Sequence, residues 1–218
     1  MTPVGKLRIA VLASGGGTDT QAVIDACEAG LIEGVVVVVV SNNSRAGVLE
    51  RARRHGIPAH HLSSYHYSDE ADLDRAFVEL LRGCDVNLVA LAGYMKKRGS
   101  AFLAAFPHRV LNIHPALLPG PHGGEGKYGI HVHESVLAAG DKVTGVSIHL
   151  VDEEYDRGPV VARREVPVLP DDTPTSLQQR VLAVEHEFYP AVLAAVERGE
   201  VDLDAIAAGA GPADINGE

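Results

Sequence analysis

The chain has 218 residues, of which 46% are hydrophobic and 22% charged, a composition that excludes an intrinsically disordered protein and allows one sizeable core. Its formal net charge of −10 argues against an extended nucleic-acid surface, because phosphate binding requires clustered lysine and arginine side chains. The apolar runs are far shorter than the ~20 residues that span a bilayer. Two cysteines, Cys27 and Cys84, are too few for a disulfide framework and indicate a reducing, cytoplasmic location.

The first half of the chain alternates predicted strands and helices. Six consecutive valines, from Val35 to Val40, are typical of a strand that is buried on both faces. Strands are expected over residues 7–13, 35–40, 57–62, 86–92 and 109–113, and helices over about 20–29, 46–55, 68–82 and 101–106. This alternation predicts a parallel sheet with helices on both faces.

The second half departs from that pattern. We expect a glycine-rich loop over 120–129, a helix over 132–139, strands over 145–151 and 160–168, and a long helix from 175 to about 200. The short connection between the two strands favours antiparallel pairing. The prediction is an α/β fold with a mostly parallel twisted sheet and antiparallel strands near its C-terminal part. It forms a single domain over 1–206, followed by a flexible tail over 207–218.

A glycine-rich turn follows the first predicted strand and leads into the first helix. It runs from Ser14 through three glycines to Thr18 and Asp19. Backbone N–H groups at such a helix N-terminus favour a bound phosphate. The turn lacks the third glycine of a dinucleotide fingerprint and the lysine of a Walker loop. Anion binding and an ordinary tight turn therefore both stay open on this evidence.

The strongest chemical signal lies at the end of the strand expected over 109–113. Asn112 and His114 point to one side of that strand, because side chains alternate with period two. They supply an amide that can donate to an oxyanion and an imidazole that can exchange a proton near neutral pH. Asp156, in a glycine-bounded loop, adds a carboxylate that we expect to favour the charged imidazole. The set predicts an acyl-transfer site in which a substrate amine is the nucleophile.

Three further features carry weaker predictions. The segment 94–98 ends in Lys96, Lys97 and Arg98 and follows a strand end, where it either meets an acidic ligand or is solvated. His131 and His133 could form a metal pair only on a strand, because residues two apart on a helix do not face each other. No acidic or cysteine cluster completes that pair, so we expect no metal site. Periodicity places Glu185 on the exposed side of the last helix.

In combination and order, six motifs in the chain resemble those of the formyltransferase superfamily, and in particular its folate-dependent glycinamide ribonucleotide formyltransferases. They are VLASGGG at 11–17, LAGYM at 91–95, LNIHP at 111–115, LLP at 117–119, GVSIH at 145–149 and DRGPV at 156–160. The resemblance runs from about residue 9 to 196. It implies a Rossmann-like formyltransferase fold and transfer of a formyl group from 10-formyltetrahydrofolate to the amine of glycinamide ribonucleotide, in purine biosynthesis. The partners are then small molecules, with neither nucleic acid nor membrane, and the protein is a monomer or homodimer.

The resemblance also implies a role for each matching residue. Asn112 and His114 match the family's catalytic pair, and Asp156 matches its catalytic carboxylate. The substrate phosphate and ribose are assigned to Gly17, Thr18, Asp19 and Glu185, and the folate to Met95, Lys96, Lys97, Arg98 and Asn112. Two departures affect substrate affinity: Asp19 stands where many relatives have asparagine, and Ala116 replaces a common serine.

Two other functions stay open at this point. The superfamily contains a formyltetrahydrofolate hydrolase and methionyl-tRNA formyltransferase, which share the same three residues. The hydrolase usually has an extra N-terminal domain and the tRNA enzyme an extra C-terminal domain, so the length of this chain favours the ribonucleotide enzyme. The alternatives are the hydrolase, with water as nucleophile and formate as product, and a catalytically silent ligand-binding protein.

Overall fold

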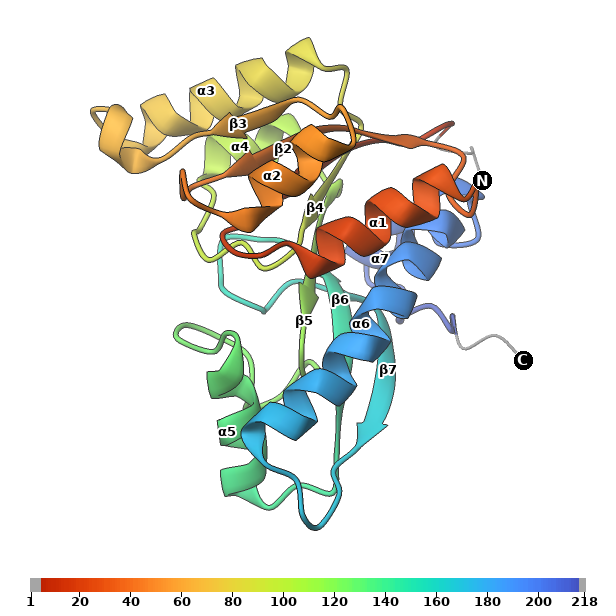
Figure 1. The fold of residues 1–218 in the computed structure, drawn as a ribbon. Coiled ribbons are helices and arrows are strands. Elements are labelled where there is room, and N and C mark those ends of the chain that lie inside the picture. Colours follow the sequence, from red (N-terminus) through yellow and green to blue (C-terminus); the bar gives the residue numbers. More distant parts are fainter. Residues whose placement is uncertain (1–4, 216–218) are drawn as a thin grey trace.

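The computed structural model describes residues 5–215, and the strands in that range form one seven-stranded sheet in the order β3-β2-β1-β4-β5-β6-β7 (Figure 1). The strands are β1 (Arg8–Leu12), β2 (Val35–Ser41), β3 (Ala59–His61), β4 (Leu88–Leu91), β5 (Val110–His114), β6 (Val143–Leu150) and β7 (Val160–Pro167). Pairing is parallel from β3 to β5 and antiparallel from β5 to β7. The predicted sheet, with antiparallel strands near its C-terminal part, is confirmed.

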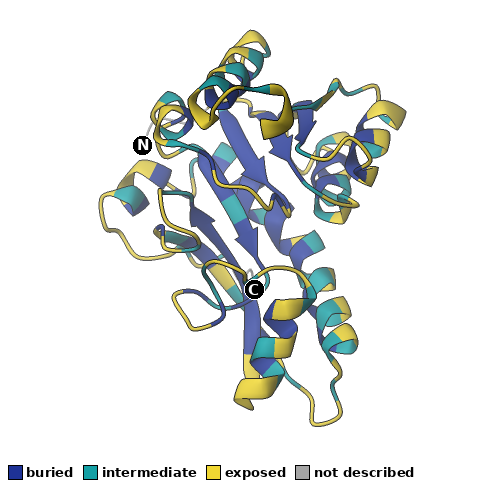
Figure 2. Ribbon diagram, turned by 90° about the vertical axis from the view of Figure 1, so that its left-hand side faces the viewer, coloured by how far each residue is buried: buried dark blue, intermediate teal, exposed yellow. Residues whose placement is uncertain are grey.

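The helices divide between two apolar layers, one on each side of the sheet. The first layer takes side chains from α1 (Thr18–Glu28), α2 (Gly47–Arg54), α5 (Ile130–Ala139), α6 (Pro174–Glu197) and α7 (Leu203–Ala207). The second takes them from α3 (Glu70–Gly83) and α4 (Ser100–Ala105), and a short 3-10 helix, η1 (Ser64–His66), precedes α3. Figure 2 shows the central strands buried and the helices exposed along one side, whereas β3 and β7 at the two edges of the sheet contain exposed residues. The central strands therefore exclude water over most of their area.

Strand alternation decides which face receives the chemical residues. On β5, Leu111 and Ile113 belong to the first apolar layer, so Asn112 and His114 point to the other side. On that side the layer formed with α3 and α4 reaches β5 at Val110. The end of β5 therefore presents two polar side chains beyond the edge of a helix layer.

The end of the chain packs back on the sheet. The tail expected from residue 207 is described up to residue 215, and within it the N–H of Ala213 donates to the carbonyl of Val161 on β7 (2.8 Å). Ala213 and Ile215 also pack against the first apolar layer. Within the described residues, no helix combines the length and the apolar character needed to cross a bilayer.

A capping box fixes the start of α6. Thr173 Oγ1 accepts from the N–H of Ser176 (3.1 Å), and Ser176 Oγ accepts from the N–H of Thr173 (2.9 Å). We expect Thr173→Ala to lower the free energy of unfolding by about 1 kcal/mol, because the N–H of Ser176 at the helix start loses its side-chain acceptor. Urea denaturation measures the change. Thr175→Ala, an exposed position two residues further, is the control, and equal losses in both variants would contradict the cap.

Candidate active site

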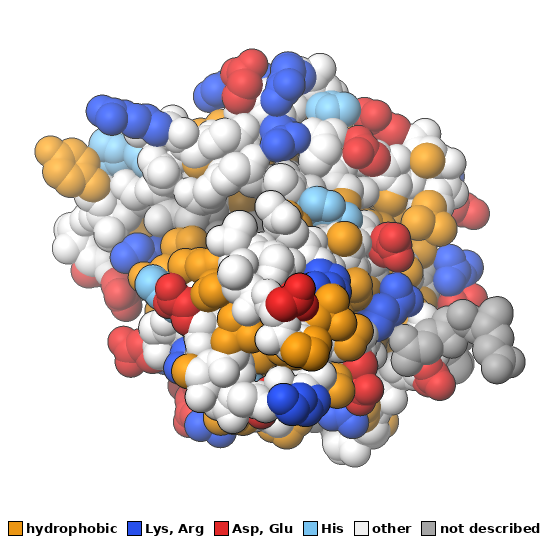
Figure 3. Space-filling view, turned by 60° about the horizontal axis from the view of Figure 1, so that its bottom comes forward, with side chains coloured by type: hydrophobic (Ala, Val, Ile, Leu, Met, Phe, Trp, Pro, Cys, Tyr) orange, Lys and Arg blue, Asp and Glu red, His pale blue; other side chains and the backbone are white. Residues whose placement is uncertain are grey.

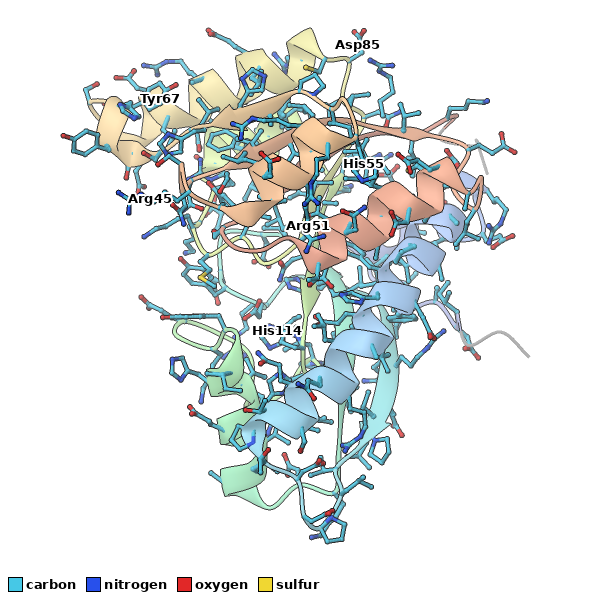
Figure 4. The ribbon with its side chains drawn as sticks, in the orientation of Figure 1. Arg45, Arg51, His55, Tyr67, Asp85 and His114 are labelled. Atoms are coloured by element: carbon cyan, nitrogen blue, oxygen red, sulfur yellow. The ribbon has the colours of Figure 1, made fainter. Side chains whose placement is uncertain are left out.

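The C-terminal ends of β1, β4 and β5 open into a cavity of about 930 Å³. Its wall comes from the turn after β1, the segment 93–98, β5, β6, the loops over 124–129 and 151–156, and α6. This is the edge where open parallel sheets bind ligands. Figure 4 shows His114 on this edge, between the part of the molecule that contains α1 to α4 and the part that contains α5.

The three residues singled out by the sequence lie together in this cavity. Asn112 Nδ2 lies 3.4 Å from Asp156 Oδ1, and His114 Nδ1 lies 3.6 Å from Asp156 Oδ2. Asp156 comes from the loop after β6 and adopts a left-handed backbone conformation, with a φ of 55° that aspartate tolerates better than most residues. The structure therefore joins an amide and an imidazole at the end of β5 with a carboxylate that follows them in the chain by 44 and 42 positions.

The surroundings of His114 fix where its proton lies. Its Nε2 is 2.9 Å from the backbone carbonyl of His122, which can only accept, so Nε2 carries a hydrogen. Burial lowers the pKa of His114, and the nearby Asp156 carboxylate offsets this only in part. The lowered pKa favours the neutral imidazole in the free protein, and a charged His114 beside Asp156 during the reaction stays a prediction. Neutral His114 has its lone pair on Nδ1, the atom that faces Asp156.

Asp156 is held ionised by several groups at once. Burial by itself raises the pKa of this carboxyl, but the imidazoles of His149 and His114 and the backbone N–H of Gly124 lower it below its ordinary value. The Gly124 N–H donates to Asp156 Oδ2 at 2.8 Å. A fixed negative charge at this position stabilises an imidazolium if His114 gains a proton during a reaction.

His149 is a fourth member of the set. Its strand, β6, pairs with β5 so that His149 lies opposite Asn112. His149 Nδ1 donates to the Leu150 carbonyl (2.8 Å), and its Nε2 lies 3.0 Å from Asn112 Nδ2 and 3.4 Å from Asp156 Oδ1. The second N–H of Asn112 faces Asp156 at 3.4 Å, a weaker contact. That N–H is the one available to a developing oxyanion.

The glycine turn forms another part of the wall. Gly17 precedes α1 with a φ of 75°, and a Cβ there would lie 2.5 Å from Val48 Cγ2, so both conformation and packing require glycine. Thr18 and Asp19 line the cavity. The Asp19 carboxylate turns toward α6, with Oδ1 3.7 Å from His186 Nε2, and burial raises its pKa while His186 opposes the rise.

Glu185 is buried, whereas periodicity predicted that it would be exposed. Only 8% of this residue is exposed, because it lies on the buried stripe of α6 that includes Val181 and Phe188. Burial, with Asp19 as a second cause, raises the pKa of Glu185 well above its ordinary value. Two carboxyl groups thus share the cavity wall near the glycine turn, and burial favours the protonated form of Glu185.

The four residues of the segment 95–98 differ in how far they are exposed to solvent. Met95, Lys96 and Lys97 are exposed along the cavity, and Lys97 Nζ lies 5.3 Å from the centre of the Tyr155 ring. Arg98 also borders the cavity, but its guanidinium is buried, with NH1 3.5 Å from Asp74 Oδ1 and Cζ 4.5 Å from the centre of the Phe77 ring. The cationic side chains free to meet a ligand are therefore the two lysines.

The histidines on α5 do not form a metal pair. His131 is exposed and pairs with Glu134, whereas His133 is buried, and burial lowers its pKa to about 4. Among the described residues, no group of three or more His, Cys, Asp or Glu side chains is placed to hold a metal ion.

Comparison with known proteins identifies the architecture. A family model described as "Formyl transferase" matches residues 7–193. The phosphoribosylglycinamide formyltransferase of Escherichia coli K12 is 38% identical over 198 residues, which cover 90% of each chain. A chloroplastic phosphoribosylglycinamide formyltransferase of Arabidopsis thaliana is 42% identical over 87% of this chain, which spans only 65% of that relative's length.

A solved structure agrees with these relatives. Glycinamide ribonucleotide transformylase 1 from Symbiobacterium toebii superimposes with a TM-score of 0.83 and 42% identity, covering 88% of each chain. The matched region contains β1 to β7 and most of α6, and therefore the whole cavity wall described above. The chain belongs to the formyl transferase family.

Proposed function

We propose that this protein transfers the formyl group of 10-formyltetrahydrofolate to the amine of glycinamide ribonucleotide, a step of purine biosynthesis. The observation that carries the proposal is the position of Asn112, His114 and Asp156 in one cavity that also contains the glycine turn. The relatives that share this architecture bear the name of that activity. The transferase is favoured over the hydrolase for the same reason.

The two substrates enter from different parts of the wall. The ribonucleotide phosphate binds the backbone N–H groups at the start of α1, around Gly17 and Thr18, where the helix dipole favours an anion. The ribose hydroxyls bind Glu185, and Asp19 lies in the turn beside the phosphate. The folate lies along the segment 95–98 and the loop 152–156, with exposed Lys96 and Lys97 beside its acidic tail. The amine and the formyl carbon then meet at Asn112 and His114.

The chain's residues stabilise charge and move a proton. The amine nitrogen bonds to the formyl carbon, and the resulting oxyanion accepts from Asn112 Nδ2. Neutral His114 takes the amine proton at Nδ1, directly or through water, and Asp156 stabilises the imidazolium. The bond from the formyl carbon to folate N10 then breaks, and the proton passes to N10. The imidazole ends neutral, as it began.

A coupled assay tests the proposal. Purified protein is mixed with 10-formyltetrahydrofolate, with and without glycinamide ribonucleotide, while folate deformylation and the formylated product are both followed. We expect turnover that requires the ribonucleotide and yields its formyl derivative. Turnover without the ribonucleotide, with release of formate, would identify a hydrolase instead. No turnover in either mixture would leave a binding protein.

Asp19 gives a prediction specific to this chain. A carboxylate close to the proposed phosphate position opposes an anion, so we expect Asp19→Asn to tighten ribonucleotide binding about threefold to tenfold, while kcat stays within about twofold. Isothermal titration with the ribonucleotide measures the change. Asp25→Asn, on the same helix, is the control. Weaker binding in Asp19→Asn would show instead that the carboxylate binds the ribose.

We also propose the setting of the reaction. The functional unit is one domain over residues 1–206, acting on small molecules as a monomer or homodimer. Cys27 and Cys84 are free thiols in the structure, which supports the reducing cytoplasm as its location. On the face shown in Figure 3, lysine and arginine side chains are interspersed with acidic ones and do not form a continuous basic strip.

A further inference from the structure

The hydrogen-bond acceptor of His114 lies in a segment with little rigidity of its own. The loop over 120–129 contains five glycines, and three of them, Gly124, Gly126 and Gly129, adopt positive φ values. Glycine loses more conformational freedom on ordering than any other residue, so this loop needs external contacts to hold one conformation. The carbonyl that accepts from His114 Nε2 belongs to His122, within this loop.

The side chain of His122 supplies such a contact. Its Nε2 lies 2.7 Å from Asp141 Oδ2, just beyond the end of α5, and its Nδ1 lies 2.9 Å from Ser135 Oγ on α5. Lys127 Nζ donates to the same Ser135 oxygen (3.1 Å), which leaves the serine hydroxyl hydrogen for His122 Nδ1. His122 is only 7% exposed. One ring nitrogen is held by α5 and the other by Asp141, just beyond the end of that helix.

Two residues further, the loop contacts the other catalytic group. The Gly124 N–H donates to Asp156 Oδ2, and a Cβ on Gly123 would lie 2.5 Å from Leu118 Cδ2 and 3.1 Å from Asp156 Cβ. The loop backbone therefore lies directly against Asp156, with no room for a side chain between them. One short stretch, 122–124, contacts both His114 and Asp156.

We propose that His122 is a positioning residue: its attachment to Ser135 and Asp141 holds the carbonyl that keeps the His114 proton on Nε2 and directs the basic Nδ1 toward Asp156 and the substrate amine. The expected effect on kcat rests on the proposed function. The position of the proton on His114 does not depend on that function. Neither Ser135 nor Asp141 is among the residues that line the cavity, so the anchor acts from outside the substrate site.

Apart from Asp141, the charged groups near His122 do not contact its ring directly. Asp141, 39% exposed in its side chain, faces Nε2, and Lys127 reaches the ring only through Ser135. On the catalytic side, the His114 ring meets the His122 backbone, not its side chain. Loss of the ring therefore frees the carbonyl without removing any group that we assign to the substrates.

The test compares His122→Ala with His122→Gln, whose amide nitrogen can replace Nε2 as donor to Asp141. In His122→Ala we expect kcat to fall about tenfold to a hundredfold, with KM for both substrates within about twofold, because a displaced catalytic group slows the reaction without weakening binding. His122→Gln should recover most of that loss. Asp141→Ala should resemble His122→Ala. The matched control, His131→Ala, removes a histidine–carboxylate pair of similar length on α5 and should leave kcat unchanged.

A second measurement separates this inference from the proposed function. Nitrogen-15 chemical shifts of His114 report its tautomer without any substrate, and thermal melting shows whether each variant is folded. We expect one Nε2–H tautomer in the wild type and a mixture in His122→Ala. An unchanged tautomer together with an unchanged kcat and KM in folded His122→Ala would overturn the inference. If the wild type shows no formyl transfer, the tautomer result still decides it.

Discussion

Replacing His114 with alanine is expected to lower kcat by about 10²- to 10⁴-fold, the range that a positioned general base contributes. The side chain is buried at the end of β5 with Nδ1 facing Asp156, whereas the other imidazole beside this carboxylate, His149, contacts Asn112 and the Leu150 carbonyl. Binding of both substrates should largely survive, because their proposed contacts lie elsewhere in the cavity. Single-turnover kinetics with separate measurement of binding distinguishes the two effects.

Asn112→Ala gives a companion result. Loss of one preorganised oxyanion donor costs about 3–4 kcal/mol, or 10²- to 10³-fold in kcat. His60→Ala, an exposed histidine on β3, is the control for both variants and should retain full turnover. Wild-type turnover in either His114→Ala or Asn112→Ala would refute the catalytic assignment.

Asp156→Asn is the second large effect that we expect. Burial lowers the pKa of His114, and Asp156 opposes that fall, so removing the charge lowers the pKa of His114 further. The imidazolium formed during the reaction then loses its stabilising carboxylate, and kcat should fall about 10²- to 10³-fold. If neutral His114 is the base, the acidic limb of the kcat/KM profile should move to lower pH in this variant. A limb that moves to higher pH, or a kcat close to that of the wild type, would contradict the role.

The same substitution has a consequence for stability. The pKa of Asp156 in the folded protein lies below its ordinary value, so its ionised form stabilises the fold at neutral pH. That contribution is present above the pKa of the unfolded chain and is lost as pH falls through the lower pKa of the folded protein. Urea denaturation at pH 7 and below pH 4 should therefore show Asp156→Asn less stable at the first pH, with a smaller difference at the second. Asp152→Asn, in the same loop, is the control.

The order of strands and helices followed from local patterns. Strands such as β2 and β4 are short apolar runs between turn residues, and α3 begins at Asp69, whose side chain accepts from the N–H of Asp72. These features act over a few neighbouring residues, so they are visible in the chain itself. The observed ends differ from the predicted ones by one to three residues at most positions, because helix and strand ends depend on what they pack against.

The residues of the site were predicted to different degrees. The spacing Asn112-x-His114 and the loop carboxylate Asp156 carry their chemistry in their side chains and were identified without coordinates. Glu185 was predicted to be exposed and is buried, because it lies on the same side of α6 as neighbours that pack against the sheet. His122 gave no local signal, since its partners follow it by 13 and 19 positions.

By itself the sequence determined the fold class, the antiparallel C-terminal strands and the three residues proposed for catalysis. Only the tertiary structure decided the burial of His114 and the hydrogen bond of its Nε2, the place of His149 opposite Asn112 and the pairing of Arg98 with Asp74. The physical reason is the range of the interactions. Alternation and capping depend on adjacent residues, whereas desolvation, strand register and buried ion pairs depend on which distant segments meet.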